Sequence, residues 1–389
     1  MRRAAIVVAV VALSGCYYEV PGRPRPAQKA REAERIERER KAEQERLARE
    51  AEAAANERAK AEAKPVAAPE PRPAVKTPLP PARTETATSL SVGQREACAV
   101  VADGKVMCWG RTSGDPSSLA GMTAVSAGYP NACAIDAQRK VWCWGLSAKG
   151  ALGHGSLDPS TTPVQVIDLA DAVSLGVGWF AACAVRETGA VVCWGANDKG
   201  ALGDGSTESR RSPQPVPGVT DAVAVTGGEG FFCALRKGGG VLCWGDTTVG
   251  QMGLGPNVKG PRRAVSPRGI AGAVAIAAGR HHVCAALAGG RVSCWGAFGG
   301  NGSSDVPRLV ADLDGVTELA AGEQTTCARR KGDVWCWGEH PVPLPGGERS
   351  SMTKNPRPIP EIDDAVQIGV GVGTVCVRRA TGVVTCLGR

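Results

Sequence analysis

The chain has few aromatic residues, few histidines and no apolar run long enough to cross a membrane. Aromatic residues make up 4% of its 389 residues, and it contains only four histidines. The apolar run at residues 4–13 is too short to span a bilayer as a mature helix. No Ser/His/Asp or paired-carboxylate pattern stands out, and the glycine-rich segments lack the lysine of a P-loop. We therefore expect no catalysis and no cofactor.

The sequence also lacks the features of a zinc site and of a nucleic-acid-binding surface. Its repeated cysteines do not form close C-x-x-C pairs, which disfavours structural zinc. Residues 91–389 hold 28 Lys and Arg against 25 Asp and Glu, so most of the net charge of +8 lies before residue 91. A near-neutral domain lacks the basic surface of a nucleic-acid binder. We expect neither a metal nor a nucleic acid as partner.

What the sequence does contain is one short unit that occurs seven times. Residues 183–195, CAVRETGAVVCWG, read as two short strands rich in β-branched residues around a tight turn. The cysteines of the seven units are Cys98 and Cys108, Cys133 and Cys143, Cys183 and Cys193, Cys233 and Cys243, Cys284 and Cys294, Cys327 and Cys336, and Cys376 and Cys386. A β unit that recurs about every 35–50 residues predicts a propeller or a β-solenoid.

The spacing within each hairpin places its two cysteines opposite each other. In six units the cysteines are ten residues apart, which leaves a three-residue loop that needs a left-handed residue at its third position. That position is held by Gly104, Gly189, Gly239, Gly290 and Gly382, and in one unit by Arg139. The shorter unit CARRKGDVWC predicts a two-residue turn at Lys331-Gly332. The facing cysteines either form disulfides or remain buried thiols, and the cellular compartment decides between these.

The N-terminus indicates export. Residues 1–15 combine two arginines, a short apolar run and small residues, which is the pattern of a signal peptide. The following LSGC sequence resembles the lipobox of bacterial lipoproteins, which implies a lipid on Cys16 and an anchor segment at residues 16–27; an ordinary secretory signal is the alternative. The residue after Cys16 is Tyr17 and not aspartate, which favours sorting of the lipoprotein to the outer membrane, either to its periplasmic face or to the cell surface. Because exported proteins meet an oxidising environment, we expect seven disulfides within the hairpins instead of free thiols.

Two segments of biased composition follow the anchor. Residues 28–64 are nearly all Ala, Glu, Arg and Lys, with opposite charges three or four residues apart, which predicts a solvated single helix. A coiled coil is the weaker alternative, because only Ile36 and Leu47 are large and apolar. Residues 65–76 are rich in Pro and Ala and predict an extended linker. Both segments are interpreted as a tether for a repeat domain at 77–389.

Glycine and proline recur at fixed distances before the cysteines. A glycine stands five residues before each first cysteine, at Gly93, Gly128, Gly178, Gly228, Gly279, Gly322 and Gly371. Fifteen residues earlier, five units carry a proline that fits the start of an outer edge strand, namely Pro78, Pro163, Pro213, Pro307 and Pro356. We expect residues 77–82 to complete the last blade and close the ring. The short spacing between Cys98 and Cys133 leaves little room for an outer strand, so six blades and a defective one are the alternative to seven.

The repeat pattern resembles a known family. It reads V-x-x-G-x-x-x-x-C-A-V/L…G-x-V-x-C-W-G, with a tail N-x-x-G-x-L-G-x-G in several units, as at residues 200–205. This pattern, and the GRHHVCA of residues 279–285, resemble the regulator of chromosome condensation repeat family. The resemblance implies an all-β, seven-bladed β-propeller, although cysteines replace the usual residues at the paired positions. The family's nucleotide exchange on a nuclear GTPase is not expected, because the chain carries an export signal and no insertion between repeats.

Four variable residues lie between each recurrent glycine and its cysteine, and they should form a ring on one face. They are unusually aromatic and charged, and aromatic and arginine side chains are common interface anchors. The candidate partner-binding residues are Tyr129, Trp179, Phe180, Glu229, Phe231, Phe232, Arg280, His281 and Glu323. The alternative is that Trp179 and the phenylalanine pair fill the junctions between blades. We expect the CWG tryptophans to be packing residues, and the His281-His282 pair to be structural.

Together these features predict a membrane-anchored propeller of the cell envelope that binds an envelope or extracellular protein or a glycan. One alternative is an inhibitor of an exported enzyme, since a secreted β-lactamase inhibitor of this propeller family grips its target with one face. A second alternative is a lyase or hydrolase with its site in the central channel.

Overall fold

The computed structural model describes residues 86–256, 258, 263–298, 302–339 and 352–388. Contacts divide the chain into two units, Met1–Val75 and Lys76–Arg389, and all described residues belong to the second. The predicted signal, anchor, helix and linker, with Cys16, lie outside the described residues, and so does the strand expected at residues 77–82. None of the helices in the described part has the length and apolar character needed to cross a membrane.

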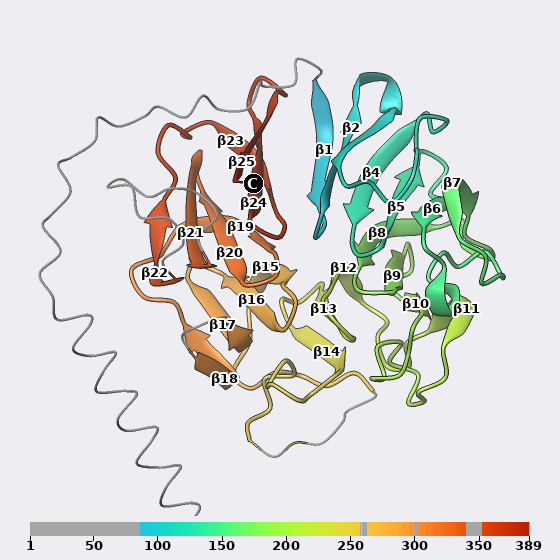
Figure 1. Cartoon of the computed structure of the whole chain (residues 1–389). Helices are drawn as coiled ribbons and strands as arrows, with labels where there is room; N and C mark the ends of the chain where they lie inside the picture. Colours follow the sequence, from blue (N-terminus) through green and yellow to red (C-terminus); the bar gives the residue numbers. More distant parts are fainter. Residues whose placement is uncertain (1–85, 257, 259–262, 299–301, 340–351, 389) are drawn as a thin grey trace, which may run out of the picture. The chain divides into compact units, whose positions relative to one another are not determined.

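Seven antiparallel sheets surround a central channel and form the predicted seven-bladed propeller (Figure 1). The inner strands are β1 (Ala87–Val92), β4 (Met122–Ala127), β8 (Ala172–Val177), β12 (Ala222–Gly227), β15 (Ala273–Ala278), β19 (Val316–Ala321) and β23 (Ala365–Val370). The second strands are β2 (Glu96–Val101), β5 (Asn131–Asp136), β9 (Ala181–Arg186), β13 (Phe231–Arg236), β16 (His282–Leu287), β20 (Thr325–Arg330) and β24 (Thr374–Arg379). The third strands are β3 (Val106–Gly110), β6 (Val141–Gly145), β10 (Val191–Gly195), β14 (Val241–Gly245), β17 (Val292–Phe298), β21 (Asp333–Glu339) and β25 (Val384–Gly388).

Within the described residues, outer fourth strands are present in four of the blades, which we number in chain order. They are β7 (Ser160–Gln165), β11 (Arg210–Pro215), β18 (Gly302–Leu309) and β22 (Met352–Pro358), in blades 2, 3, 5 and 6 respectively. The described residues also contain two short 3-10 turns, η1 (Ala102–Gly104) and η2 (Ala148–Gly150). Beyond the third strand of blade 4, the part of the chain that the structure describes shows a single bridge, from Cys243 to Val265. Blade 1 has three strands, as its short repeat spacing predicted.

The recurrent prolines lie inside the outer strands and not at their starts, which corrects that expectation. Pro163, Pro213, Pro307 and Pro356 are interior residues of β7, β11, β18 and β22. An outer strand pairs on one side only, so its residues alternate between ladder-bonded and free N–H groups. A proline is therefore tolerated along such a strand and does not mark its first residue.

The hairpin turns have the predicted register. In blade 3 Cys183 faces Cys193, Arg186 N–H donates to Ala190 O at 2.8 Å, and Gly189 closes the three-residue loop with φ 84°. Arg139 takes the same left-handed conformation with φ 64°, which costs a non-glycine residue about 1 kcal/mol. Each of the seven hairpins carries a disulfide between its two cysteines, with Cα atoms 4.0 to 4.1 Å apart.

The seven recurrent glycines form a closed ring at one end of the channel. A Cβ atom on any of them would lie 2.3 to 2.7 Å from the carbonyl oxygen of the corresponding glycine in the next blade, and the last, Gly371, meets Gly93 of the first. Such a distance excludes a side chain, so the close approach of neighbouring blades requires glycine. Across the same closure, Leu90 exchanges two hydrogen bonds of 3.0 Å with the Gln367 side chain.

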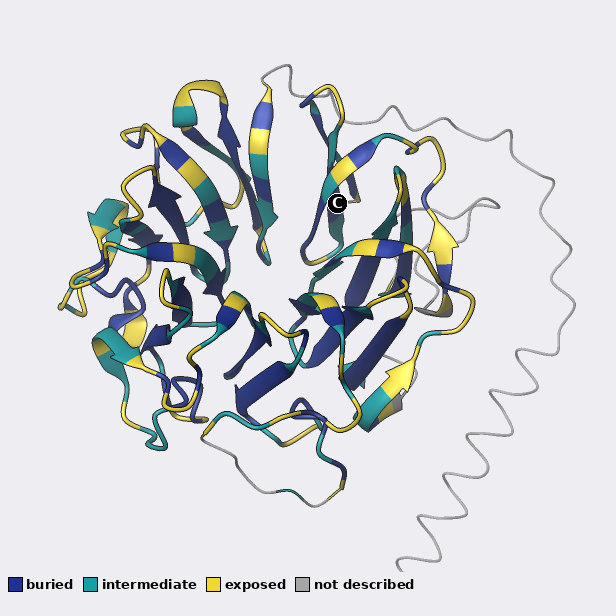
Figure 2. Ribbon diagram, turned by 180° about the vertical axis from the view of Figure 1, so that it is seen from behind, coloured by how far each residue is buried: buried dark blue, intermediate teal, exposed yellow. Residues whose placement is uncertain are grey.

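The CWG tryptophans join neighbouring blades, as the packing prediction requires. In three of them the indole N–H donates to a carbonyl in the glycine-rich tail of the preceding blade: Trp194 to Ala151 at 3.1 Å, Trp244 to Ala201 at 2.8 Å and Trp295 to Gln251 at 2.8 Å. Blade 1 has no such tail, and the Nε1 of Trp144 is buried without a partner. Burial is concentrated in the middle strands of the blades, which appear dark blue in Figure 2.

Candidate functional site

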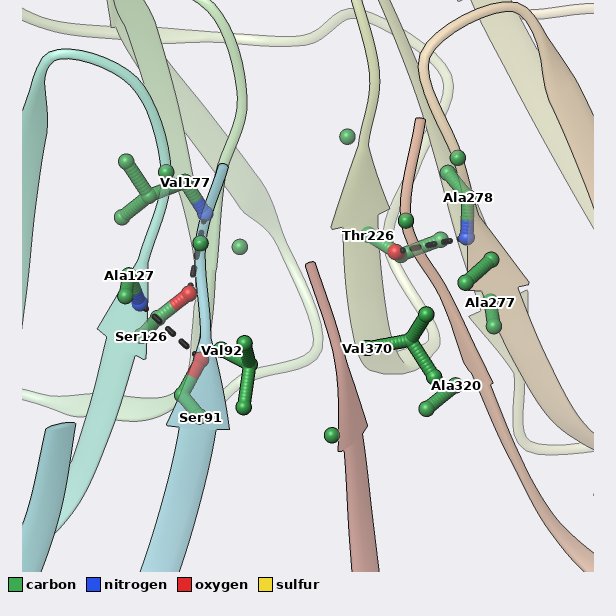
Figure 3. A pocket seen from close by; sticks show the side chains of 18 of the residues that line it. Ser91, Val92, Ser126, Ala127, Val177, Thr226, Ala277, Ala278, Ala320 and Val370 are labelled. Atoms are coloured by element: carbon green, nitrogen blue, oxygen red, sulfur yellow. Dashed lines mark hydrogen bonds between the residues drawn. The ribbon is translucent and has the colours of Figure 1, made fainter. Parts of the chain in front are cut away.

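The central channel is lined mainly by small and aliphatic residues of the seven inner strands. Its volume is about 220 Å³, and among its described lining residues only Arg280 and Glu323 are charged. The hydroxyl groups of the lining hold the blades together: Ser91 Oγ accepts a hydrogen bond from Ala127 N–H at 3.0 Å, Ser126 from Val177 at 3.1 Å, and Thr226 from Ala278 at 3.1 Å (Figure 3). The lining is therefore poor in groups that could act on a substrate.

An aromatic cluster lies at the end of the channel that carries the glycine ring, which we call the glycine-end mouth. Tyr129 and Trp179 have ring centroids 5.2 Å apart, and Phe180 meets Tyr129 edge-on at 6.1 Å. The backbones are also joined, because Phe180 N–H donates to Tyr129 O at 2.9 Å. All three side chains are half-buried. The rings therefore form one rigid ridge across blades 2 and 3.

An arginine joins this ridge to two carboxylates. The Cζ atom of Arg280 lies 4.5 Å from the ring centroid of Trp179, and its guanidinium donates to Glu229 and to Glu323 at 2.7 Å each. These hydrogen bonds, the one to Glu229 first, raise the pKa of Arg280. His281 lies 3.6 Å from the same Glu229 oxygen, and burial lowers the pKa of His281 below its usual value. One arginine thus connects blades 3, 4, 5 and 6.

Seven of the nine predicted site residues meet at this mouth, but two do not. Phe231 and Phe232 are completely buried and fill the junction between blades, so they are core residues and not partner contacts. Their rings occupy the space that Cβ atoms would take on Gly228 and Gly227, and Phe232 stacks on Trp244 with centroids 6.4 Å apart. Phe231 and Phe232 are the first residues of strand β13, whereas Trp179 lies in the loop before strand β9, and this difference in position separates the buried rings from the one at the mouth.

Two residues at the mouth were missed in the sequence. Arg95, in the four-residue window of blade 1, is exposed and its Cζ lies 5.7 Å from the ring centroid of Tyr129. Leu146 is 51% exposed, and its N–H donates to the carbonyl oxygen of Pro130, the residue after Tyr129, at 3.2 Å. Arg95 belongs to the variable window, which could have identified it. Leu146 follows the CWG motif, and only the folded hairpin brings that end to the mouth.

The second histidine of the adjacent pair is part of the core. His282 is fully buried, its Nε2 lies 2.8 Å from Thr326 Oγ1, and its Nδ1 has no partner among the described residues. Burial, assisted by His281, lowers the pKa of His282 to about 4. In the described part of the chain, the metal-ligand atoms that cluster are those of Glu96, Cys98 and Cys108. Their two sulfurs are bonded to each other and so cannot act as thiolate ligands.

Comparison with protein families gave matches in the middle of the repeat region. A model described as regulator of chromosome condensation (RCC1) repeat matches residues 140–185, 188–235 and 238–286, and a second RCC1 repeat model matches residues 172–201 and 222–251. Comparison with curated protein sequences gave no match.

Solved structures with the same fold include yeast RCC1 (Prp20) bound to Kap60. That structure is 21% identical with a TM-score of 0.60, and the match covers 69% of this chain and 70% of that one. Human WBSCR16 is 18% identical with a TM-score of 0.65, covering 79% and 87%. Prp20p from Saccharomyces cerevisiae, described with its binding to Gsp1p and histones, is 21% identical with a TM-score of 0.59, covering 69% and 72%. At these identities the likeness shows the fold alone.

Proposed function

We propose that this seven-bladed propeller of RCC1 repeats is a protein-binding scaffold whose partner site is the glycine-end mouth. Propellers of this type are typically binding or regulatory scaffolds. The yeast relatives are described with Kap60, Gsp1p and histones, and these are partners of the yeast proteins. For this chain they support only the general use of the fold in protein binding.

The rigid aromatic and arginine cluster is the observation that carries this proposal. Trp179 is held between Tyr129 and Arg280, and Arg280 is held by two carboxylates, so the side chains are ordered before a partner arrives. Ordered aromatic and arginine side chains lose little entropy on binding and are typical energetic centres of protein interfaces. Stacking on a sugar ring would need a free aromatic face, whereas Arg280 already lies over the ring of Trp179 and Tyr129 packs against it at a tilt of 49°. We therefore favour a protein over a glycan as the partner.

We further propose that the scaffold works in the cell envelope, anchored by a lipid on Cys16. The signal-like residues 1–15 and the LSGC sequence support this proposal. Seven disulfides in one domain also suit an exported protein, because reducing compartments keep such thiols free. Partition of the wild type and of Cys16→Ala between membrane and soluble fractions tests the anchor. Equal membrane association of both would contradict it.

The binding proposal is tested by crosslinking the full chain in the envelope of its own cells. Trp179→Ala removes the centre of the cluster, and we expect at least about a tenfold loss of the crosslinked partner, as for an interface hot spot. Val223→Ala is the matched control, because Val223 is 48% exposed near the opposite end of inner strand β12. Melting temperatures of both variants confirm that they fold. Partner capture that is unchanged by Trp179→Ala, or lost equally in Val223→Ala, would refute the site.

A further inference from the structure

The disulfide of blade 1 differs from those of blades 2 to 6 in what lies beside it. In those five blades a residue of an outer strand or bridge faces the second cysteine: Cys143 and Val164, Cys193 and Gln214, Cys243 and Val265, Cys294 and Arg308, Cys336 and Arg357. All of those cysteines are buried. Blade 1 ends at β3, so no described strand covers Cys108, and this cysteine is half-buried while Cys98 is fully buried.

A buried carboxyl group accompanies this accessible disulfide. The ligand atoms of Glu96, Cys98 and Cys108 all lie within 4.8 Å of one another. Glu96 is 4% exposed, and its carboxylate accepts hydrogen bonds from the N–H and Oγ of Ser113 at 2.8 and 2.5 Å. Burial raises the pKa of Glu96, although the Ser113 hydrogen bonds act in the opposite direction. The equivalent positions of the other blades hold no acidic residue; they are Asn131, Ala181, Phe231, His282, Thr325 and Thr374.

We propose that Cys98–Cys108 is a thiol–disulfide exchange site that oxidises a dithiol, with Glu96 as the proton donor to the departing sulfur. Exchange proceeds by attack of a thiolate on one sulfur of a disulfide, and access to that sulfur limits the rate. Cys108 lies on the edge strand β3 and is half-buried, whereas the second cysteines of blades 2 to 6 are buried. Cys98 lies on the neighbouring strand β2, on the far side from this edge, where it can leave as the nucleophile enters.

The chemistry balances with the dithiol as the reductant. Its thiolate attacks Cys108 Sγ, the bond between Cys98 and Cys108 breaks, and the electron pair leaves on Cys98, which takes the proton of the Glu96 carboxyl. The second thiol of the reductant, after loss of its proton to solvent, then attacks its own first sulfur in the mixed disulfide and releases Cys108 as a thiolate. Cys108 and Glu96 are protonated from solvent. The dithiol loses two electrons and becomes a disulfide, and both cysteines become thiols.

The test follows all seven disulfides of the full chain during reduction. Dithiothreitol serves as a small dithiol and reduced thioredoxin as a protein dithiol; samples are alkylated at intervals and the bridges are quantified by peptide mass spectrometry. We expect Cys98–Cys108 to open at least about tenfold faster than the buried Cys183–Cys193. The matched control is Cys376–Cys386, because Cys386 is also half-buried but no carboxyl group occupies the Glu96 position. Faster opening of Cys98–Cys108 than of both comparison disulfides, with either dithiol, supports the site, and the dithiol that reacts faster indicates the size of its substrate.

Glu96→Gln separates proton donation from simple exposure. Gln has the shape of Glu but cannot give up a proton, so we expect the Cys98–Cys108 rate to fall about tenfold, to that of Cys376–Cys386. The ratio of wild-type to variant rates should decrease as pH rises, since Glu96 then loses its proton. Ser113→Ala keeps the Glu96 carboxyl group but removes a hydrogen bond that lowers its pKa. In this variant the rate advantage over Glu96→Gln should therefore persist to higher pH. Equal opening of Cys98–Cys108 and Cys183–Cys193, or rates unchanged by Glu96→Gln at every pH, would overturn the proposal.

Discussion

Replacing one glycine of the ring by alanine should loosen the whole propeller, and Gly322→Ala is the sharpest case. Its new Cβ would lie 2.3 Å from Gly371 O and 3.0 Å from Val370 Cγ1. The nearest obstacle is backbone and cannot rotate away, so β19 must move from β23. That movement also strains the 3.0 Å hydrogen bond from Arg280 N–H to Gly322 O. Overpacking of this kind costs about 1–3 kcal/mol.

The matched control is Gly238→Ala in a hairpin loop. No atom lies within 4 Å of the position that a Cβ on Gly238 would take, and its φ is in the ordinary range. This variant should stay within about 0.5 kcal/mol of the wild type, or gain slightly from a less flexible unfolded chain. Urea unfolding of the oxidised protein, followed by tryptophan fluorescence, measures both midpoints. A Gly322→Ala midpoint equal to that of Gly238→Ala would show that contact between the glycines does not hold the ring closed.

Two further predictions concern buried polar groups. Trp295→Phe removes a 2.8 Å hydrogen bond and leaves Gln251 O unpaired, whereas Trp144→Phe removes an indole N–H that has no acceptor. We therefore expect Trp295→Phe to lower the free energy of unfolding in urea by at least about 1 kcal/mol more than Trp144→Phe does. Equal losses would refute the tail-to-tryptophan bond. His282 has a folded pKa of about 4, below its value in the unfolded chain, so the unfolded state binds more protons between these values and stability should fall as pH decreases through that window. His282→Phe should flatten this pH dependence of the unfolding free energy, and an unchanged slope would contradict the assignment.

Much of the fold follows from patterns that are local in the chain. The register of each hairpin was predictable because the turn type and the cysteine spacing concern about ten consecutive residues, as at Gly189 and Arg139. The glycine ring was visible as a repeat, although only the structure shows that each glycine touches the next. The proline positions were misplaced because an edge strand tolerates proline along its length. Seven of the nine predicted site residues lie together because one repeat position maps to one end of the channel, whereas Phe231 and Phe232 are buried.

The sequence by itself determined the hairpin unit and which cysteines face each other, because these depend on short-range spacing repeated seven times. It favoured seven blades over six, and the structure has seven. Only the tertiary structure decided which aromatic side chains face solvent, as Trp179 partly does, and which turn inward, as Phe232 does. It also decided that Arg280 pairs across blades and that Glu96 lies beside an uncovered disulfide. These outcomes depend on how side chains from different strands and blades pack against one another, and the spacing of residues along the chain does not specify the distances between blades.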